Sequence, residues 1–252
     1  MPGRKREHTE SVHDGDTRKI FFLSTSEKHK LELTPSQEAK AALEEVRAWC
    51  VSQGKESDDL DWVGRQRGVP EVLEMGADHM NCEGLMCVMD KSPLAFSKIA
   101  GGDKWEHGFH AGVADFARFV LSLLAKFTGE PERALAAVRR GCGKHGELSF
   151  DLYWLGRQCV QEVEHRGPAH PSHSGVTKVL ADCPEVARKI ADGDEHAHGY
   201  HGGVVAFSRL VNSLATTEWQ DFTGNTDDPA RPWLSPFDAR EGAKAEWPDL
   251  SS

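Results

Sequence analysis

Two stretches of the chain decide its fold: HGFHAGVADFARFVLSLL, from His107 to Leu124, and HGYHGGVVAFSRLVNSLA, from His198 to Ala215. They are identical at ten of eighteen positions. In each stretch the apolar residues recur at alternating steps of four and three, which places them on one face of an α-helix. These residues are Phe109, Val113, Phe116, Val120 and Leu123 in the first stretch, and Tyr200, Val204, Phe207, Val211 and Leu214 in the second. Both stretches therefore predict a long amphipathic helix.

Glycines lie at the edge of each apolar face. They are Gly108 and Gly112 in the first stretch, and Gly199 and Gly203 in the second. A glycine inside a helix costs about 1 kcal/mol relative to alanine, so pairs at this spacing need a structural reason. Because a missing side chain lets another backbone come close, we expect these two helices to pack tightly, one copy against the other.

A second pair of matching stretches extends the repeat. DLDWVGRQ (Asp59–Gln66) and DLYWLGRQ (Asp151–Gln158) are identical at six of eight positions, at an offset of 92 residues against 91 for the first pair. We therefore predict an all-α fold, a tandem duplication of a multi-helix unit of about 91 residues packed with pseudo-twofold symmetry. The expected parts are a charged head over 1–33 with a short hairpin at Lys19–Leu33, helical repeats over 34–127 and 128–217, and an acidic tail containing Trp and Pro over 218–252.

Capping and turn signals divide each unit into helices. Thr34-Pro35-Ser36-Gln37 is a capping-box start with proline at the first helical position. A second helix is expected after Ser57 or Ser149, ending near Gly68-Val69-Pro70 in the first unit and near Gly167-Pro168 in the second. The last and longest helix of each unit is expected after Asp103 or Asp194.

Composition narrows the class of protein. The net charge of −10 repels a phosphate backbone, so no nucleic-acid partner is expected. No apolar run approaches the roughly 20 residues that span a bilayer, and the head lacks the apolar core of a secretory signal. The six cysteines form no C-x-x-C pair, which favours free thiols. We expect a soluble, intracellular, cytoplasmic protein without a membrane partner.

A histidine motif is repeated at the start of the longest helix. Asp103, His107 and His110 in the first unit match Asp194, His198 and His201 in the second. Two histidines and a carboxylate can hold zinc or iron, so His107, His110, His198 and His201 are the candidate metal ligands, at the seam between the units. The alternatives are structural histidines with each aspartate as a helix N-cap, or acid–base catalysis. One helix alone cannot complete the site, because positions i and i+7 lie about 10.5 Å apart.

The Trp-x-Gly-Arg-Gln block is the candidate ligand-binding site. Its residues are Trp62 and Arg65 in the first unit and Trp154 and Arg157 in the second. Each arginine could bind an anionic ligand or pair with a carboxylate of the last helix, and each tryptophan could be a core residue. No P-loop, nucleophile elbow or H-E-x-x-H motif occurs in the chain.

These patterns favour one function and leave a second open. The first is a helical tandem-repeat protein that binds another protein, with the acidic tail contributing. The second is a metal-binding protein or metal-dependent enzyme with its histidines at the seam. Whether the chain is an enzyme is left open by the residues themselves.

Overall fold

The computed structural model describes residues 34–216, so the expected hairpin at Lys19–Leu33 and the acidic tail lie outside the described residues. Within residues 34–216 the chain forms ten α-helices, two short 3-10 helices and no strand, which confirms the all-α prediction. The first half contains α1 (Pro35–Arg65), α2 (Val69–Met75), η1 (Gly76–Asp78), α3 (Cys82–Lys91), α4 (Pro93–Ala100) and α5 (Lys104–Lys126). The second contains α6 (Pro131–Gly156), α7 (Val160–Arg166), η2 (Gly167–Ala169), α8 (His173–Asp182), α9 (Pro184–Ala191) and α10 (Glu195–Ala215).

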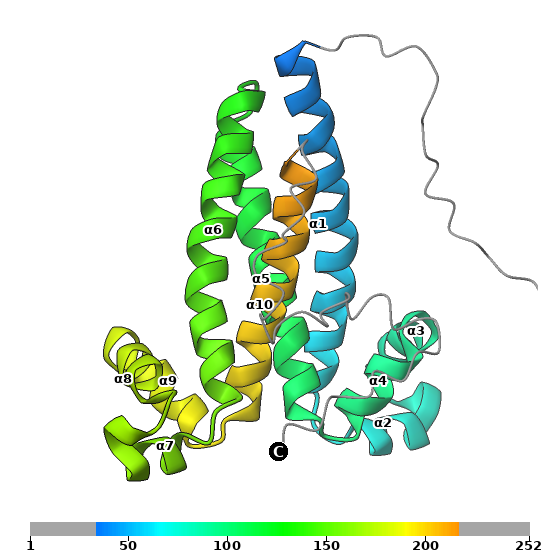
Figure 1. Cartoon of the computed structure of the whole chain (residues 1–252). Helices are drawn as coiled ribbons and strands as arrows, with labels where there is room; N and C mark the ends of the chain where they lie inside the picture. The colour runs from blue at the N-terminus through cyan, green and yellow to red at the C-terminus, as the bar shows by residue number, and fades with distance from the viewer. Residues whose placement is uncertain (1–33, 217–252) are drawn as a thin grey trace, which may run out of the picture. The chain divides into compact units, whose positions relative to one another are not determined.

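The four long helices share the main hydrophobic core. Helices α5 and α10 pack along each other, with α1 against α5 and α6 against α10 (Figure 1). Their common core includes side chains that are fully buried, among them Val46, Val113, Val138 and Phe207. This core joins the first and second halves into one packed unit.

The short helices form two smaller cores. Helices α2–α4 lie beside the C-terminal part of α1, and α7–α9 beside the C-terminal part of α6 (Figure 1). Leu60 and Leu85 are fully buried in the first small core, and Leu155 and Val176 are buried in the second. The two helical groups at the ends of α1 and α6 are therefore held by their own apolar contacts.

The prediction of a separate second helix after Ser57 or Ser149 was wrong. Both α1 and α6 continue through these positions without a break. The small residues there serve packing instead: a Cβ atom added to Gly54 would lie 2.7 Å from the Cβ of Ala117, and one added to Gly146 would lie 2.8 Å from Oγ of Ser208. The glycines near these two positions permit close approach of a neighbouring helix.

One predicted helix end also falls elsewhere. Helix α6 ends at Gly156 and the expected stop at Gly167-Pro168 ends the short α7 instead, where Gly167 adopts a φ of 55°. A positive φ of this kind favours glycine. The Gly-Pro signal is thus a real helix end, but it belongs to the next helix.

The starts of the long helices agree with their capping signals. Asp103 accepts a hydrogen bond of 2.9 Å from the backbone N–H of Glu106, and Asp194 accepts one of 3.0 Å from Ala197. Thr34 and Gln37 form the expected capping box. Both aspartates of the histidine motif are therefore helix caps.

Close packing of α5 against α10 is confirmed at all four glycines. A Cβ atom added to Gly108 or Gly112 would lie 2.1 Å from the carbonyl oxygen of His196 or Tyr200. In return, a Cβ atom on Gly199 or Gly203 would lie 2.1 Å from the carbonyl oxygen of Trp105 or Phe109. Each helix therefore presents its glycines to the backbone of the other.

Helix α5 is the single helix of residues 34–216 that is long and apolar enough to cross a membrane. Of its most apolar stretch of 18 residues, 56 % is buried inside the protein. Core helices often have this composition. The absence of a membrane partner stays a prediction.

Candidate functional site

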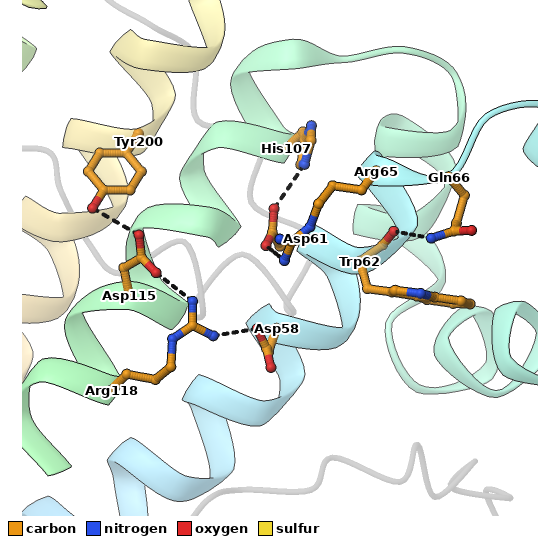
Figure 2. A network of polar contacts seen from close by, with 9 residues as sticks. All are labelled: Asp58, Asp61, Trp62, Arg65, Gln66, His107, Asp115, Arg118 and Tyr200. Carbon is orange, nitrogen blue, oxygen red and sulfur yellow. Dashed lines mark hydrogen bonds and ion pairs between the residues drawn. The ribbon is translucent and has the colours of Figure 1, made fainter. Parts of the chain in front are cut away.

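A hydrogen bond joins the histidine motif to the Trp-x-Gly-Arg-Gln block. Nε2 of His107 on α5 lies 3.0 Å from Oδ1 of Asp61 on α1, and the other carboxylate oxygen of Asp61 accepts a hydrogen bond from Arg65 (Figure 2). The side chain of Asp61 is 9 % exposed and that of His107 is 18 % exposed, whereas Arg65 is 60 % exposed. A buried carboxylate with two donors is well satisfied, so this arrangement stabilises the contact of α1 with α5.

Neighbouring polar contacts tie the same helices together. Arg118 of α5 donates to Asp58 of α1 at 2.6 Å and also pairs with Asp115 (Figure 2). Tyr200 of α10 donates to Asp115 at 3.1 Å, and burial together with that carboxylate raises the pKa of Tyr200 to about 12. The network in Figure 2 therefore spans α1, α5 and α10.

His110, the second histidine of the first unit, is 7 % exposed. Its Nδ1 lies 3.1 Å from Oγ of Ser57, and its Nε2 lies 3.8 Å from a carboxylate oxygen of Glu106. Burial acts to raise the pKa of Glu106, but hydrogen bonds from His110 and Lys98 outweigh it and lower that pKa. Both ring nitrogens of His110 thus face partners within the fold.

The second unit keeps one of these contacts and changes the other. Nδ1 of His201 lies 3.2 Å from Oγ of Ser149, as His110 does from Ser57. His198 packs against Tyr153, which occupies the position of Asp61 in the repeat, with ring centroids 5.0 Å apart. Nε2 of His198 is buried without a hydrogen-bond partner among the described residues. The aspartate–histidine pair is therefore confined to the first unit.

Burial lowers the pKa of three histidines on α10. It lowers the pKa of His196 and of His198, and it lowers the pKa of His201 to about 4. His107 adds to the effect on His196, because their rings lie 4.6 Å apart, edge to face. These imidazoles are favoured in the neutral form.

The four predicted metal ligands do not meet as one cluster. His107 faces His196, and His198 faces Trp105 with ring centroids 6.5 Å apart. Within residues 34–216, no group of three or more His, Cys, Asp or Glu side chains is arranged to hold a metal ion. The metal site, with zinc or iron, stays a prediction that this geometry does not support.

The tryptophans of the predicted ligand site pack within the fold. Trp62 borders the first small core and Trp154 the second, each over a glycine, Gly84 or Gly175. The neighbouring Gln66 donates to the carbonyl of Trp62 at 3.2 Å (Figure 2). It also accepts from Asn81 at 3.1 Å, so the block holds the end of α1 to the start of α3.

The two arginines of that block differ. Arg65 pairs with Asp61 on its own helix rather than with the last helix of the unit. Arg157 is exposed, and the equivalent pair is missing because Tyr153 replaces Asp61. Binding of an anionic ligand by these residues stays a prediction.

An open hollow of about 670 Å³ lies where the α4–α5 turn meets the start of α10. Lys98, Asp103, Trp105, Glu195 and His198 are among its lining residues. Lys98 already pairs with Glu106, and Asp103 caps α5. Two of its charged groups are therefore engaged in holding the fold.

Several large hydrophobic side chains are exposed to solvent on α2–α4. Four of the seven large hydrophobic side chains exposed within residues 34–216 lie on this short stretch. They are Met75, 55 % exposed, Met80, 91 %, Met86, 41 %, and Leu94, 68 %, and we call them the methionine surface. Several large apolar side chains exposed along one short stretch of chain favour an interaction site.

Reasoning from the sequence missed the methionine surface. The signal was available, because the equivalent residues of the second unit are polar or small. At an offset of 91, Met75, Met80, Met86 and Leu94 correspond to Arg166, Pro171, Thr177 and Glu185. Positions on a repeated helix that are apolar in one copy and polar in the other are not needed for the core.

No known protein family matches the chain, and no curated protein or solved structure is detectably similar to it. Its function is therefore inferred from the chemistry of its own residues.

Proposed function

We propose that this chain is a helical tandem-repeat protein that acts by binding another protein, with two related units packed about a pseudo-twofold axis. Equivalent contacts in the two halves support the repeat. Ser57 and Ser149 contact His110 and His201 at 3.1 Å and 3.2 Å, and Gly108 and Gly199 each face the backbone of the opposite helix. The two units share a scaffold but differ on their surfaces.

The methionine surface carries the binding proposal. Burying a methionine or leucine side chain contributes about 1.5–3 kcal/mol, so four such groups on one segment supply enough apolar area for the centre of an interface. Methionine suits this role because its flexible thioether adapts to different partner shapes. By contrast, His107, His110 and Arg65 of the repeated blocks already have partners inside the fold.

Two variants test the proposal in the full chain. The first replaces three residues of the methionine surface by their second-unit counterparts, Met75→Arg, Met86→Thr and Leu94→Glu. The matched control changes the second unit, with Arg166→Ser, Thr177→Ser and Glu185→Gln. All six positions are exposed, so both variants should unfold at the same temperature as the original chain.

The readout is quantitative capture from a lysate of the source organism. A specific partner should be lost with the methionine-surface variant and retained with the control. Equal capture by both variants, or no enriched partner with any of them, would show that this surface is not a protein-binding site. A third variant, Trp233→Ala with Trp247→Ala, measures what the tail adds.

The proposed location is intracellular. All six cysteines lie within the described residues and all are free thiols. Free thiols persist in the reducing cytoplasm. Cys50, Cys82 and Cys142 are buried, whereas Cys87 and Cys159 are exposed, so an oxidising compartment would leave reactive groups on the surface.

A further inference from the structure

The segment that carries the methionine surface also carries an excess of negative charge. Between residues 69 and 100 there are five carboxylates and two lysines. The carboxylates are all exposed, and they are Glu71, Glu74, Asp78, Glu83 and Asp90. Within residues 34–216, none of the five takes part in an ion pair, while both lysines pair with carboxylates outside the segment, Lys91 with Asp59 and Lys98 with Glu106.

The equivalent segment of the second unit has no such excess. Residues 160–191 contain four carboxylates and four lysines or arginines. Two of the carboxylates form ion pairs inside the segment, Glu162 with Arg166 at 2.7 Å and Glu164 with Arg188 at 3.0 Å. Within residues 34–216, five carboxylates of the first segment and two of the second form no ion pair, and only the first segment contains methionine.

We infer that the methionine surface binds a basic amphipathic segment of a partner protein. This inference rests on the proposed function and names the chemistry of the partner. Apolar side chains of the segment would cover Met75, Met80, Met86 and Leu94, while its lysines and arginines would face the five carboxylates. Complementary charge speeds association and suppresses wrong partners, and the apolar contacts supply most of the affinity.

The same charges argue against other occupants. Anionic lipid headgroups and nucleic acids are repelled by these five carboxylates, none of which forms an ion pair within residues 34–216. The chain's own tail from residue 218 onward has eight acidic and three basic residues, so it carries charge of the same sign. A basic protein segment is the occupant that matches both the apolar and the acidic character of this surface.

The first experiment uses synthetic peptides of about 18 residues, or five helical turns. One is an amphipathic helix built from leucine and lysine, a second has glutamate in place of lysine, and a third has the composition of the first in a scrambled order. Fluorescence anisotropy measures their binding to the full chain. The leucine–lysine peptide should bind at least about tenfold more tightly than either of the others, and added salt should weaken it.

Variants separate this site from general attraction to an acidic protein. The carboxylate variant carries Glu71→Gln, Glu74→Gln, Asp78→Asn, Glu83→Gln and Asp90→Asn. The matched control carries Glu162→Gln, Glu164→Gln, Asp182→Asn and Glu185→Gln in the second unit. We expect the carboxylate variant to weaken binding about tenfold or more and the control to weaken it less than about twofold. Equal weakening by both variants overturns the inference, as does failure of the leucine–lysine peptide to bind.

A carbodiimide cross-linker, which joins a carboxylate directly to an amine, locates the bound peptide. Cross-links from the peptide's lysines should fall on the carboxylates from Glu71 to Asp90 rather than on those from Glu162 to Glu185.

The two proposals fail in different ways. If capture depends on the methionine surface but the basic peptide is not preferred, the proposed function stands. Only the inference of a basic partner is then refuted. Capture that is indifferent to the methionine surface refutes the proposed function itself.

Discussion

Nε2 of His107 on α5 lies 3.0 Å from Oδ1 of Asp61 on α1, and this pair has no equivalent in the second unit. The carboxylate is buried and also accepts a hydrogen bond from the exposed Arg65. The contact therefore holds two long helices together at the point where the histidine motif and the Trp-x-Gly-Arg-Gln block meet.

Replacement of Asp61 should destabilise the fold more than replacement of its exposed partner. Asp61→Ala leaves His107 without its acceptor, and we expect a loss of about 1–3 kcal/mol in the free energy of unfolding. Arg65→Ala should lose less than about 1 kcal/mol, because that side chain is 60 % exposed. Urea unfolding followed by circular dichroism measures both. Equal effects of the two substitutions would contradict a structural role for the buried pair.

The glycine contacts between α5 and α10 predict strong intolerance to a single methyl group. A Cβ atom on Gly112 would lie 2.1 Å from the carbonyl oxygen of Tyr200, so Gly112→Ala should destabilise the protein by about 3 kcal/mol or more. Gly143 on α6 is the control, because nothing lies within 4 Å of a Cβ atom there. Gly143→Ala should stabilise the protein by up to about 1 kcal/mol through helix propensity. The unfolding temperature should fall for Gly112→Ala and rise for Gly143→Ala.

Burial of the second-unit histidines predicts that acid weakens the fold. The pKa of His201 falls from 6.5 to about 4 on burial, so between these values the unfolded chain binds a proton that the folded chain does not. The free energy of unfolding should therefore decrease as the pH falls from 6.5 toward 4. His201 contributes no more than about 3 kcal/mol to this decrease.

The variant His201→Gln tests this prediction, since it removes the titrating group. Its free energy of unfolding should drop less than that of the original chain between about pH 7 and about pH 5. The exposed His165 supplies the control, and His165→Gln should follow the original chain. A His201→Gln variant with the original pH dependence would show that another group is responsible.

Thiol labelling tests the burial of the core. Burial raises the pKa of Cys50 and of Cys142 to about 12, so neither thiol should react in the folded protein at neutral pH. Cys87 and Cys159 are exposed and should react with iodoacetamide under the same conditions. Mass spectrometry of labelled peptides before and after addition of denaturant distinguishes the two classes. Rapid labelling of Cys50 in the native protein would be incompatible with this core.

Local signals in the sequence predicted the helix starts and the closest helix contact. An aspartate before a helix makes its capping bond within one turn, so Asp103 and Asp194 could be assigned from the sequence. The glycine pairs were informative for a similar reason, because a glycine inside an amphipathic helix has few other uses. The continuity of α1 was harder to predict, because Ser57 resembles a helix start until His110 is known to contact it.

The candidate site could not be predicted from local signals in the sequence. The Asp61–His107 pair joins residues 46 positions apart, and nothing local to either residue indicates the other. The exposure of Met86 depends on how α3 is rotated: Leu85 is fully buried, while Met86, the next residue, is 41 % exposed. Comparison of the two matching halves of the sequence indicates both positions, because Tyr153 aligns with Asp61 and Thr177 with Met86.

The paired glycines of α5 and α10 make each half of the chain depend on the other. A polypeptide that stopped after α5 would leave Gly108 and Gly112 without the backbone of α10 to cover them. Its best substitute is the α5 helix of a second molecule, which carries the same two glycines. A half-length chain should therefore be a homodimer or fail to fold.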